Sequence, residues 1–211
     1  MKESYSQKTS TFLQVKGYPG LENMREFIIQ YIPKSKIYVE PFAGLGRTCE
    51  SKHSRVILND KSDYAVSYLK SHFPFAEITQ EDFKVCMLKH DSEDTFFLID
   101  PPWRKNIYQN NALPFNDRTP IQYYDELLKE ILPKLKGSWI LCVDRDEHEI
   151  SKRVSKSGYD NLVIQHPNKV LFNRPLAVRM ASNKPFIKQE SLNLDSFLEL
   201  PQHYFSSGRI E

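Results

Sequence analysis

Short apolar runs alternate with stretches of helical spacing along most of this chain, and no other feature limits its possible fold as strongly. The apolar runs predict seven strands, at 37–39, 56–58, 76–78, 96–99, 139–143, 162–164 and 176–180. Helical spacing and capping residues predict helices at 21–32, 62–72, 83–88, 121–132 and 146–156. This alternation indicates an α/β fold, with a mostly parallel sheet covered by helices on both faces.

Two details refine the predicted sheet. The runs 96–99 and 139–143 are apolar throughout, as expected of strands buried on both faces. The last two predicted strands have no helix between them, so we expect a seven-stranded sheet that ends in an antiparallel hairpin.

The composition fits one ordinary domain and excludes several classes of protein. Lys and Arg number 29 against 27 Asp and Glu, which argues against a strongly basic protein that coats a polyanion. No apolar run approaches the ~20 residues of a membrane span, and the polar N-terminus lacks the apolar region of a signal peptide. Three scattered cysteines without a Cys-x-x-Cys pair favour a reducing, cytoplasmic location.

Ligands of such sheets bind beyond the carboxyl ends of the strands, so the residues that follow each strand are the most informative. The first strand is followed by Glu40, Pro41, Phe42, Ala43 and a turn containing Gly44 and Gly46, where a ligand can approach the backbone. A nicotinamide-cofactor loop would have a third glycine where Cys49 stands, and a phosphate loop would have Gly-Lys-Ser/Thr. A simple tight turn remains the alternative.

Acidic residues follow the second and third strands. Asp60 is placed to accept hydrogen bonds from both hydroxyls of a ribose, although an acidic residue at a helix N-terminus is the common alternative. After the third strand, Asp82 can accept a hydrogen bond from an adenine amino group while Phe83 lies against the ring. Neither signal is specific alone.

The most specific signal follows the fourth strand, where the chain runs Asp100-Pro101-Pro102-Trp103. Two consecutive prolines fix φ twice and remove two N–H donors, and the residue before a proline is held extended. The result is a rigid corner that presents one carboxylate, free carbonyl oxygens and a large aromatic face.

With these motifs, the sequence resembles the class I S-adenosylmethionine-dependent methyltransferases, which have a Rossmann-like fold. More narrowly, it resembles the Dam-like adenine-specific DNA methyltransferases. The resemblance covers roughly residues 14–186 and rests on the segments 39–46, 58–60, 81–83, 100–103, 136–141 and 182–183.

This resemblance implies a reaction and a set of site residues. S-adenosylmethionine is the implied cofactor, and its methyl group passes directly to the exocyclic N6 amine of a flipped-out adenine in DNA. The implied catalytic residues are Asp100, Pro101, Pro102 and Trp103. The implied cofactor-binding residues are Lys16, Tyr18, Glu40, Pro41, Phe42, Gly44, Gly46, Asp60, Asp82, Phe83 and Asp100. No metal is expected, since the six histidines show no ligand spacing.

The sequence also departs from the family pattern. Tyr18-Pro19-Gly20 lacks the lysine that usually follows, so Lys16 is assigned to hold the carboxylate of the cofactor. Trp103 replaces the usual tyrosine, as in eukaryotic methyltransferases that act on RNA adenosine. Gly46 and Asp100 are 54 positions apart, which leaves no space for a separate target-recognition insertion. The same reaction on RNA, or a non-catalytic nucleic-acid-binding relative, therefore remains an alternative.

The remaining expectations concern partners and chain organisation. We expect a flexible arm at 1–12, a methyltransferase domain at 13–186 and a tail at 187–211 with an amphipathic piece. The long polar stretch after Trp103 predicts nucleic-acid contacts through Arg104, Lys105 and Arg118. The expected partner is DNA, with RNA as the alternative, and no membrane. A separate specificity subunit or a paired restriction enzyme is compatible with this pattern, as are a monomer and a dimer.

Overall fold

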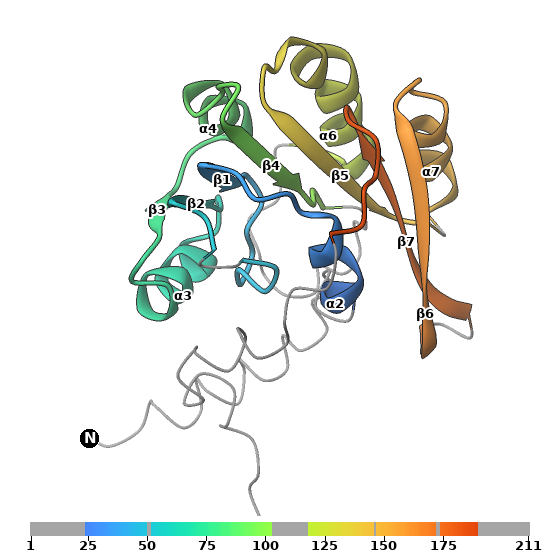
Figure 1. Ribbon diagram of the computed structural model, residues 1–211, viewed down its shortest axis with the longest axis horizontal. Helices are drawn as coiled ribbons and strands as arrows, with labels where there is room; N and C mark the ends of the chain where they lie inside the picture. The colour runs from blue at the N-terminus through green and yellow to red at the C-terminus, as the bar shows by residue number, and fades with distance from the viewer. Residues whose placement is uncertain (1–23, 50–51, 103–117, 146, 172–173, 190–211) are drawn as a thin grey trace, which may run out of the picture.

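The computed structural model describes residues 24–49, 52–102, 118–145, 147–171 and 174–189. Seven strands in these ranges form one sheet (Figure 1). They are β1 (Ile37–Glu40), β2 (Arg55–Asn59), β3 (Glu77–Thr79), β4 (Thr95–Ile99), β5 (Ser138–Asp144), β6 (Asp160–Leu171) and β7 (Arg174–Ser182).

The strand order is β3-β2-β1-β4-β5-β7-β6. The pairs from β3 to β5 are all parallel, whereas β7 runs antiparallel to both β5 and β6. The strand order therefore reverses between β1 and β4: β2 and β3 are added on one side of β1, and the later strands follow on the other side. Val39 of β1 pairs with Phe97 of β4 at this position. This is the point at which open α/β sheets bind ligands. The predicted parallel sheet and its final hairpin are confirmed.

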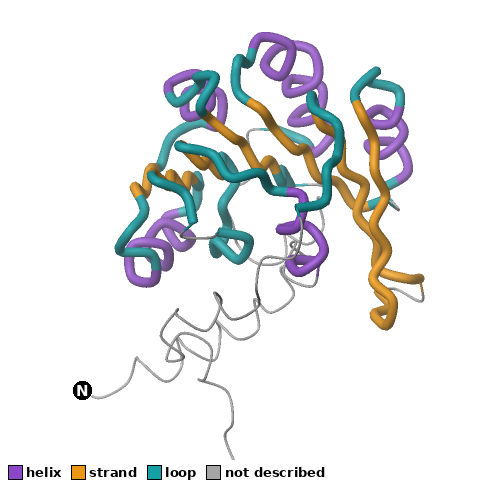
Figure 2. Tube along the Cα trace, viewed as in Figure 1, coloured by secondary structure: helices purple, strands orange, loops and turns teal. Residues whose placement is uncertain are grey.

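The described helices are α2 (Arg25–Ile28), α3 (Asp63–His72), α4 (Phe83–Lys89), α6 (Pro120–Glu126) and α7 (His148–Ser155), drawn in purple in Figure 2. The predicted helix 121–132 differs in detail. It begins with a capping box between Thr119 and Gln122 and continues beyond Glu126 as a π turn and then a 3-10 turn. Pro133 lies in that last turn and lacks the N–H that a longer α-helix would use.

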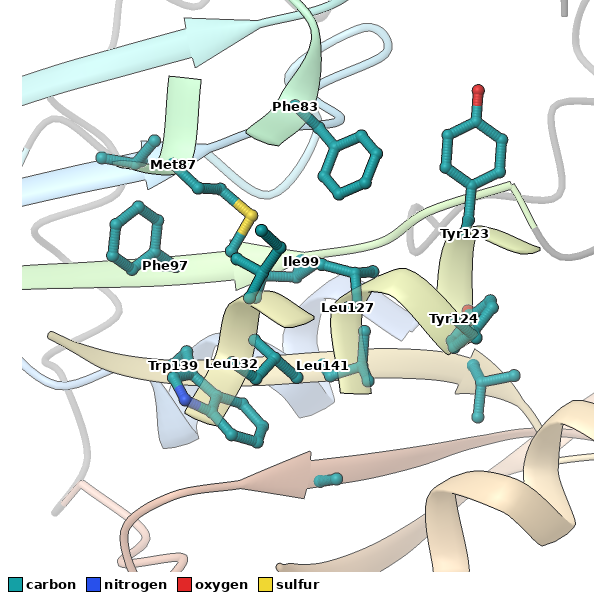
Figure 3. Close-up of a cluster of buried hydrophobic side chains, with 14 of the residues drawn as sticks. Phe83, Met87, Phe97, Ile99, Tyr123, Tyr124, Leu127, Leu132, Trp139 and Leu141 are labelled. Atoms are coloured by element: carbon teal, nitrogen blue, oxygen red, sulfur yellow. The ribbon is translucent and has the colours of Figure 1, made fainter. Parts of the chain in front are cut away.

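Two hydrophobic clusters cover the two faces of the sheet. On one face, Phe97 of β4 and Trp139 of β5 belong to a cluster with buried side chains of α4, α6 and α7, and Figure 3 shows part of this cluster. On the other face, Tyr38 of β1 and Phe96 of β4 belong to a second cluster with buried side chains of α2 and α3. Neighbouring residues of one strand thus enter opposite clusters, as predicted for strands that are apolar throughout.

The final hairpin is longer than predicted. The strand β6 continues through the polar residues 165–169, with a shift in register between Gln165 and Val170, so the apolar pattern alone ended the predicted strand too early. Within the described residues, no helix has the length and apolarity needed to cross a membrane.

Candidate functional site

The carboxyl ends of four parallel strands bring most of the predicted site residues to one edge of the sheet. Glu40 is the last residue of β1, Asp60 follows β2, and Asp100 follows β4. Asp82 comes after β3 and caps the first turn of α4. The parallel pairing of β1 with β2 and β4, and of β2 with β3, places these four acidic residues along the same edge.

The glycine turn after β1 is stabilised by its own backbone. Ala43 N donates to the Asn59 carbonyl at 2.8 Å, and Gly46 N donates to the Ala43 carbonyl at 2.7 Å. Gly44 and Gly46 have φ values of 53° and 65°, a region that favours glycine. A Cβ on Gly46 would lie 2.8 Å from the Phe73 ring, so this glycine is required by the close approach of the turn to the end of α3.

Asp60 holds this turn in place. Its Oδ2 accepts a hydrogen bond from Gly44 N at 2.8 Å, and its Oδ1 accepts one from Ser62 N at 2.9 Å. The residue is 5% exposed, and this burial raises the pKa of Asp60 while the backbone hydrogen bonds oppose the rise. The carboxylate therefore links the glycine turn to the start of α3, and its contact with a ribose stays a prediction.

Asn59 connects three of the strand ends, and the sequence analysis assigned it no role. Its Nδ2 donates to the carbonyls of Pro41 and Glu81, at 3.0 and 3.1 Å. Its Oδ1 accepts hydrogen bonds from Glu81 N at 2.8 Å and Thr79 Oγ1 at 2.9 Å. With every hydrogen-bonding group used and 1% exposure, Asn59 fixes the loops after β1 and β3 to the end of β2. Only the spatial neighbourhood of the strands reveals this role.

Glu40 is a buried carboxyl close to Asp100. Its Oε1 accepts hydrogen bonds from Tyr38 Oη at 2.6 Å and Thr48 Oγ1 at 3.2 Å. Burial raises the pKa of Glu40 to about 7; the two hydrogen bonds oppose this rise, and the negative charge of Asp100 adds to it. Burial raises the pKa of the Cys142 thiol in β5, and the negative charges of Asp100 and Glu40 raise it further. The charges at the ends of β1 and β4 thus act on a buried thiol within β5.

The Asp-Pro-Pro corner lies at the centre of this edge. Asp100 is half-buried and comes directly after Ile99, the last residue of β4, while Pro101 and Pro102 are buried. The corner is therefore anchored to the middle strand of the sheet.

Asp82 and Phe83 follow β3 at the start of α4, and Arg118 contacts both. Asp82 Oδ1 accepts a hydrogen bond from Lys84 N at 3.0 Å, and its Oδ2 accepts one from Arg118 Nη1 at 2.9 Å. The Phe83 ring is buried, 5.0 Å from the ring of Phe42, so its predicted contact with adenine stays a prediction. Phe42 is half-buried and is the more accessible aromatic residue here.

Arg118, predicted to bind nucleic acid, is engaged by two carboxylates of the protein itself, those of Asp82 and Glu126. The predicted site residues that lie outside the described residues are Lys16, Tyr18, Trp103, Arg104 and Lys105. Their roles stay predictions. Among the described residues, no group of three His, Cys, Asp or Glu side chains is arranged to hold a metal ion.

One pocket of about 330 Å³ lies away from these groups. Its lining includes Ser35, Thr95 and Ser138, which stand before or at the start of β1, β4 and β5. The pocket is therefore at the amino ends of the strands, on the edge opposite the acidic cluster. Parallel sheets bind ligands at the carboxyl ends, so we assign the candidate site to the acidic edge.

Comparison with solved structures identifies the fold. A Streptococcus mutans protein assigned as a methyltransferase, solved in complex with SAH, matches with a TM-score of 0.51 and 14% identity, over 77% of this chain and 97% of the other. The fold is that of the Rossmann-like methyltransferases. Precorrin 8w decarboxylase from Methanobacterium thermoautotrophicum matches this fold with a TM-score of 0.50 and 15% identity, over 77% and 89% of the two chains. No protein-family model and no curated protein matches the sequence.

Proposed function

We propose that this protein is an S-adenosylmethionine-dependent methyltransferase that acts on the N6 amine of adenine in DNA. The observation that carries the proposal is the position of the rigid Asp100-Pro101-Pro102 corner. It follows the central strand β4, directly beside β1 and its glycine turn, at the edge where this fold binds ligands. The sequence of the corner indicates the class of reaction, and the fold puts the corner at the carboxyl end of β4.

The side chains at this edge suit the proposed cofactor. The carboxyl groups of Glu40, Asp60 and Asp82 lie along the ends of β1, β2 and β3. Those of Glu40 and Asp60 are buried and hydrogen-bonded within the protein, whereas the side chain of Asp82 is 28% exposed. The adenine amino group of S-adenosylmethionine is a donor that suits Asp82, and the contacts of its ammonium group and ribose hydroxyls with Glu40 and Asp60 stay predictions. When bound, S-adenosylmethionine supplies a methyl group on a sulfonium centre, a strong electrophile. The Streptococcus mutans neighbour was solved with SAH, the demethylated form of this cofactor.

Asp100 and Pro101 would act on the target amine. The lone pair of an exocyclic adenine amine is delocalised into the ring, which makes the amine a poor nucleophile. The Asp100 carboxylate and the Pro101 carbonyl accept the two amine hydrogens, which localises the lone pair and directs it toward the methyl donor. Since Pro101 and Pro102 lack N–H groups, no backbone donor of theirs competes for the carboxylate.

Orientation accounts for most of the expected rate enhancement. A corner fixed by two prolines holds the amine in one geometry, and alignment of the reacting atoms lowers the barrier without a strong base. Trp103 would stack on the flipped base, which offsets lost base stacking by ~1–3 kcal/mol. The two roles are separable, because Asp100 acts on the amine while Trp103 acts on the ring.

RNA is the second candidate substrate. It is supported by Trp103, which matches methyltransferases that act on RNA adenosine, and by the short interval between Gly46 and Asp100, which lacks a DNA-recognition insertion.

Parallel assays separate the substrates. Transfer of a labelled methyl group from S-adenosylmethionine is measured on duplex DNA, single-stranded DNA and RNA of the same sequence, and the modified base is identified as N6-methyladenine by mass spectrometry. Faster transfer to RNA than to either DNA would overturn the DNA assignment. Binding of the cofactor without transfer to any of the three would favour a non-catalytic relative.

Two substitutions test the assigned roles. Asp100→Ala should abolish transfer while cofactor affinity stays close to that of the parent protein, because its carboxylate is assigned to the target amine. Asp60→Ala should weaken cofactor binding first, because it releases Gly44 N and Ser62 N and so loosens the cofactor turn. An equal loss of cofactor affinity in both variants would show that the roles are assigned incorrectly.

A further inference from the structure

We infer that Arg118 is a positioning residue for cofactor recognition, which orients the Asp82 carboxylate toward the amino group of the cofactor's adenine. The inference rests on the proposed cofactor and replaces the expectation that Arg118 binds nucleic acid. The site should therefore favour a 6-aminopurine, which donates a hydrogen bond, over a 6-oxopurine, which accepts one.

The orientation of Asp82 is determined by two hydrogen bonds. Oδ1 accepts from Lys84 N at 3.0 Å, and Oδ2 accepts from Arg118 Nη1 at 2.9 Å. Each carboxylate oxygen can accept a second hydrogen bond, and the side chain is 28% exposed. Asp82 therefore retains acceptor capacity at an accessible surface, and the torsion of its carboxylate depends on Arg118.

Arg118 is itself held on three sides. Its Nε lies 3.0 and 3.1 Å from the two oxygens of Glu126, and its guanidinium lies 5.3 Å from the Phe83 ring centroid and 5.6 Å from that of Tyr123. Phe83 and Tyr123 come from α4 and α6 and are neighbours in Figure 3. The side chain is only 18% exposed, so this guanidinium is poorly placed to neutralise a phosphate group.

Lys84 closes a ring of four charged residues. Its Nζ lies 2.6 Å from Glu126, and its backbone N donates to Asp82, while Arg118 connects Glu126 with Asp82 on the other side. The ring joins the first turn of α4 to α6. Because a guanidinium is planar and presents several donors in a fixed arrangement, it can serve both carboxylates, which a lysine ammonium serves poorly.

The test compares binding of two ligands by calorimetry: SAH and its 6-oxo counterpart, S-inosylhomocysteine. The full-length parent protein should bind SAH more tightly. Arg118→Met should weaken SAH binding by at least about tenfold while leaving the inosine ligand within about twofold, so the preference collapses. Arg118→Lys should retain part of the preference, and it also serves if the methionine variant does not fold. Lys129→Met is the matched control, since Lys129 is an exposed cation of the same region that pairs with Asp125.

A double substitution tests whether Arg118 acts through Asp82. Once Asp82→Asn has removed the carboxylate, adding Arg118→Met should reduce SAH affinity no further. Additive losses of SAH affinity from the two substitutions would overturn the inference. Equal weakening of SAH and S-inosylhomocysteine binding by Arg118→Met would also overturn it, because Arg118 would then only stabilise the packing of α4 against α6. If Arg118→Met leaves SAH binding unchanged and reduces the affinity for DNA, the inference is wrong and Arg118 contacts nucleic acid instead.

The outcomes also separate this inference from the proposed function. Binding of SAH with the expected preference but no methyl transfer to a nucleic acid supports the role of Arg118 and refutes the proposed reaction. Failure of the parent protein to bind SAH refutes both. Methyl transfer with equal affinity for the two ligands refutes the role of Arg118 alone.

Discussion

Replacement of Glu40 by glutamine should stabilise the protein at alkaline pH. Glu40 is 3% exposed, and its burial raises its pKa from the ordinary 4.5 to about 7. Between these values the folded protein holds a proton that the unfolded chain has released. Stability contributed by this group is therefore complete at low pH and is lost as pH rises through this interval.

The size of the effect follows from the two pKa values. The interval from 4.5 to about 7 corresponds to about 3 kcal/mol lost once pH is well above 7. A glutamine at this position has the shape of the neutral acid, and its side-chain oxygen can accept the hydrogen bonds from Tyr38 and Thr48. The variant should thus avoid the loss without disturbing the neighbouring side chains.

The assay is urea unfolding followed by circular dichroism, without cofactor, at about pH 5 and about pH 8.5. The free energy of unfolding of Glu40→Gln, relative to the parent, should rise by about 2–3 kcal/mol between the two conditions. Glu93→Gln, at an exposed position before β4, is the control and should show no such rise. An equal difference at both pH values would refute the reasoning, because Glu40 would then be ionised in the folded protein at acidic pH.

The remaining predictions concern folding and use the same measurement. Burial lowers the pKa of His53 from 6.5 to about 4, so the stability that this residue contributes is complete above about pH 6.5 and is lost as pH falls toward 4. His53→Phe, which can keep the stacking on Tyr38, should remove about 1–2 kcal/mol of that loss at acidic pH. An unchanged dependence of stability on acidic pH would contradict this prediction. Gly46→Ala should cost about 2–4 kcal/mol, because the new Cβ meets the Phe73 ring at 2.8 Å and φ is +65°. Gly158→Ala, with φ of +85° and open space around it, should cost only about 1 kcal/mol, so equal losses would rule out the packing explanation.

Helix and strand positions were predictable wherever the pattern was local. Ser62 was identified as the cap of a helix to His72, and its side chain accepts a hydrogen bond from Ala65 N in the structure. The apolar runs of β4 and β5 predicted strands buried on both faces, which the two hydrophobic clusters confirm. The π and 3-10 turns after Glu126 were not predicted, since apolar spacing does not distinguish them from an α-helix.

The side-chain partners at the site were not predictable in the same way. Arg118 lies at the end of a long polar stretch rich in Asn, a pattern that predicts nucleic-acid contacts, yet it pairs with Asp82, which is 36 positions away in the chain. Asn59 looked like an ordinary residue beside an acidic one, but it joins loops that only the sheet brings together.

The amino-acid sequence by itself determined the order of strands and helices, the parallel sheet with its closing hairpin, and the acidic and proline-rich residues that end the strands. These features depend on neighbours within a few positions, or on the alternation of elements along the chain. Only the tertiary structure decided which acidic groups are occupied by the protein itself: Asp60 by backbone amides, Asp82 by Arg118, and Glu40 by Tyr38 and Thr48. Gly44 and Arg118 are distant in the chain from the carboxylates that they contact, and the burial of Glu40 and Asp60 depends on the assembled sheet, so the charge and availability of these groups are set only when the strands come together.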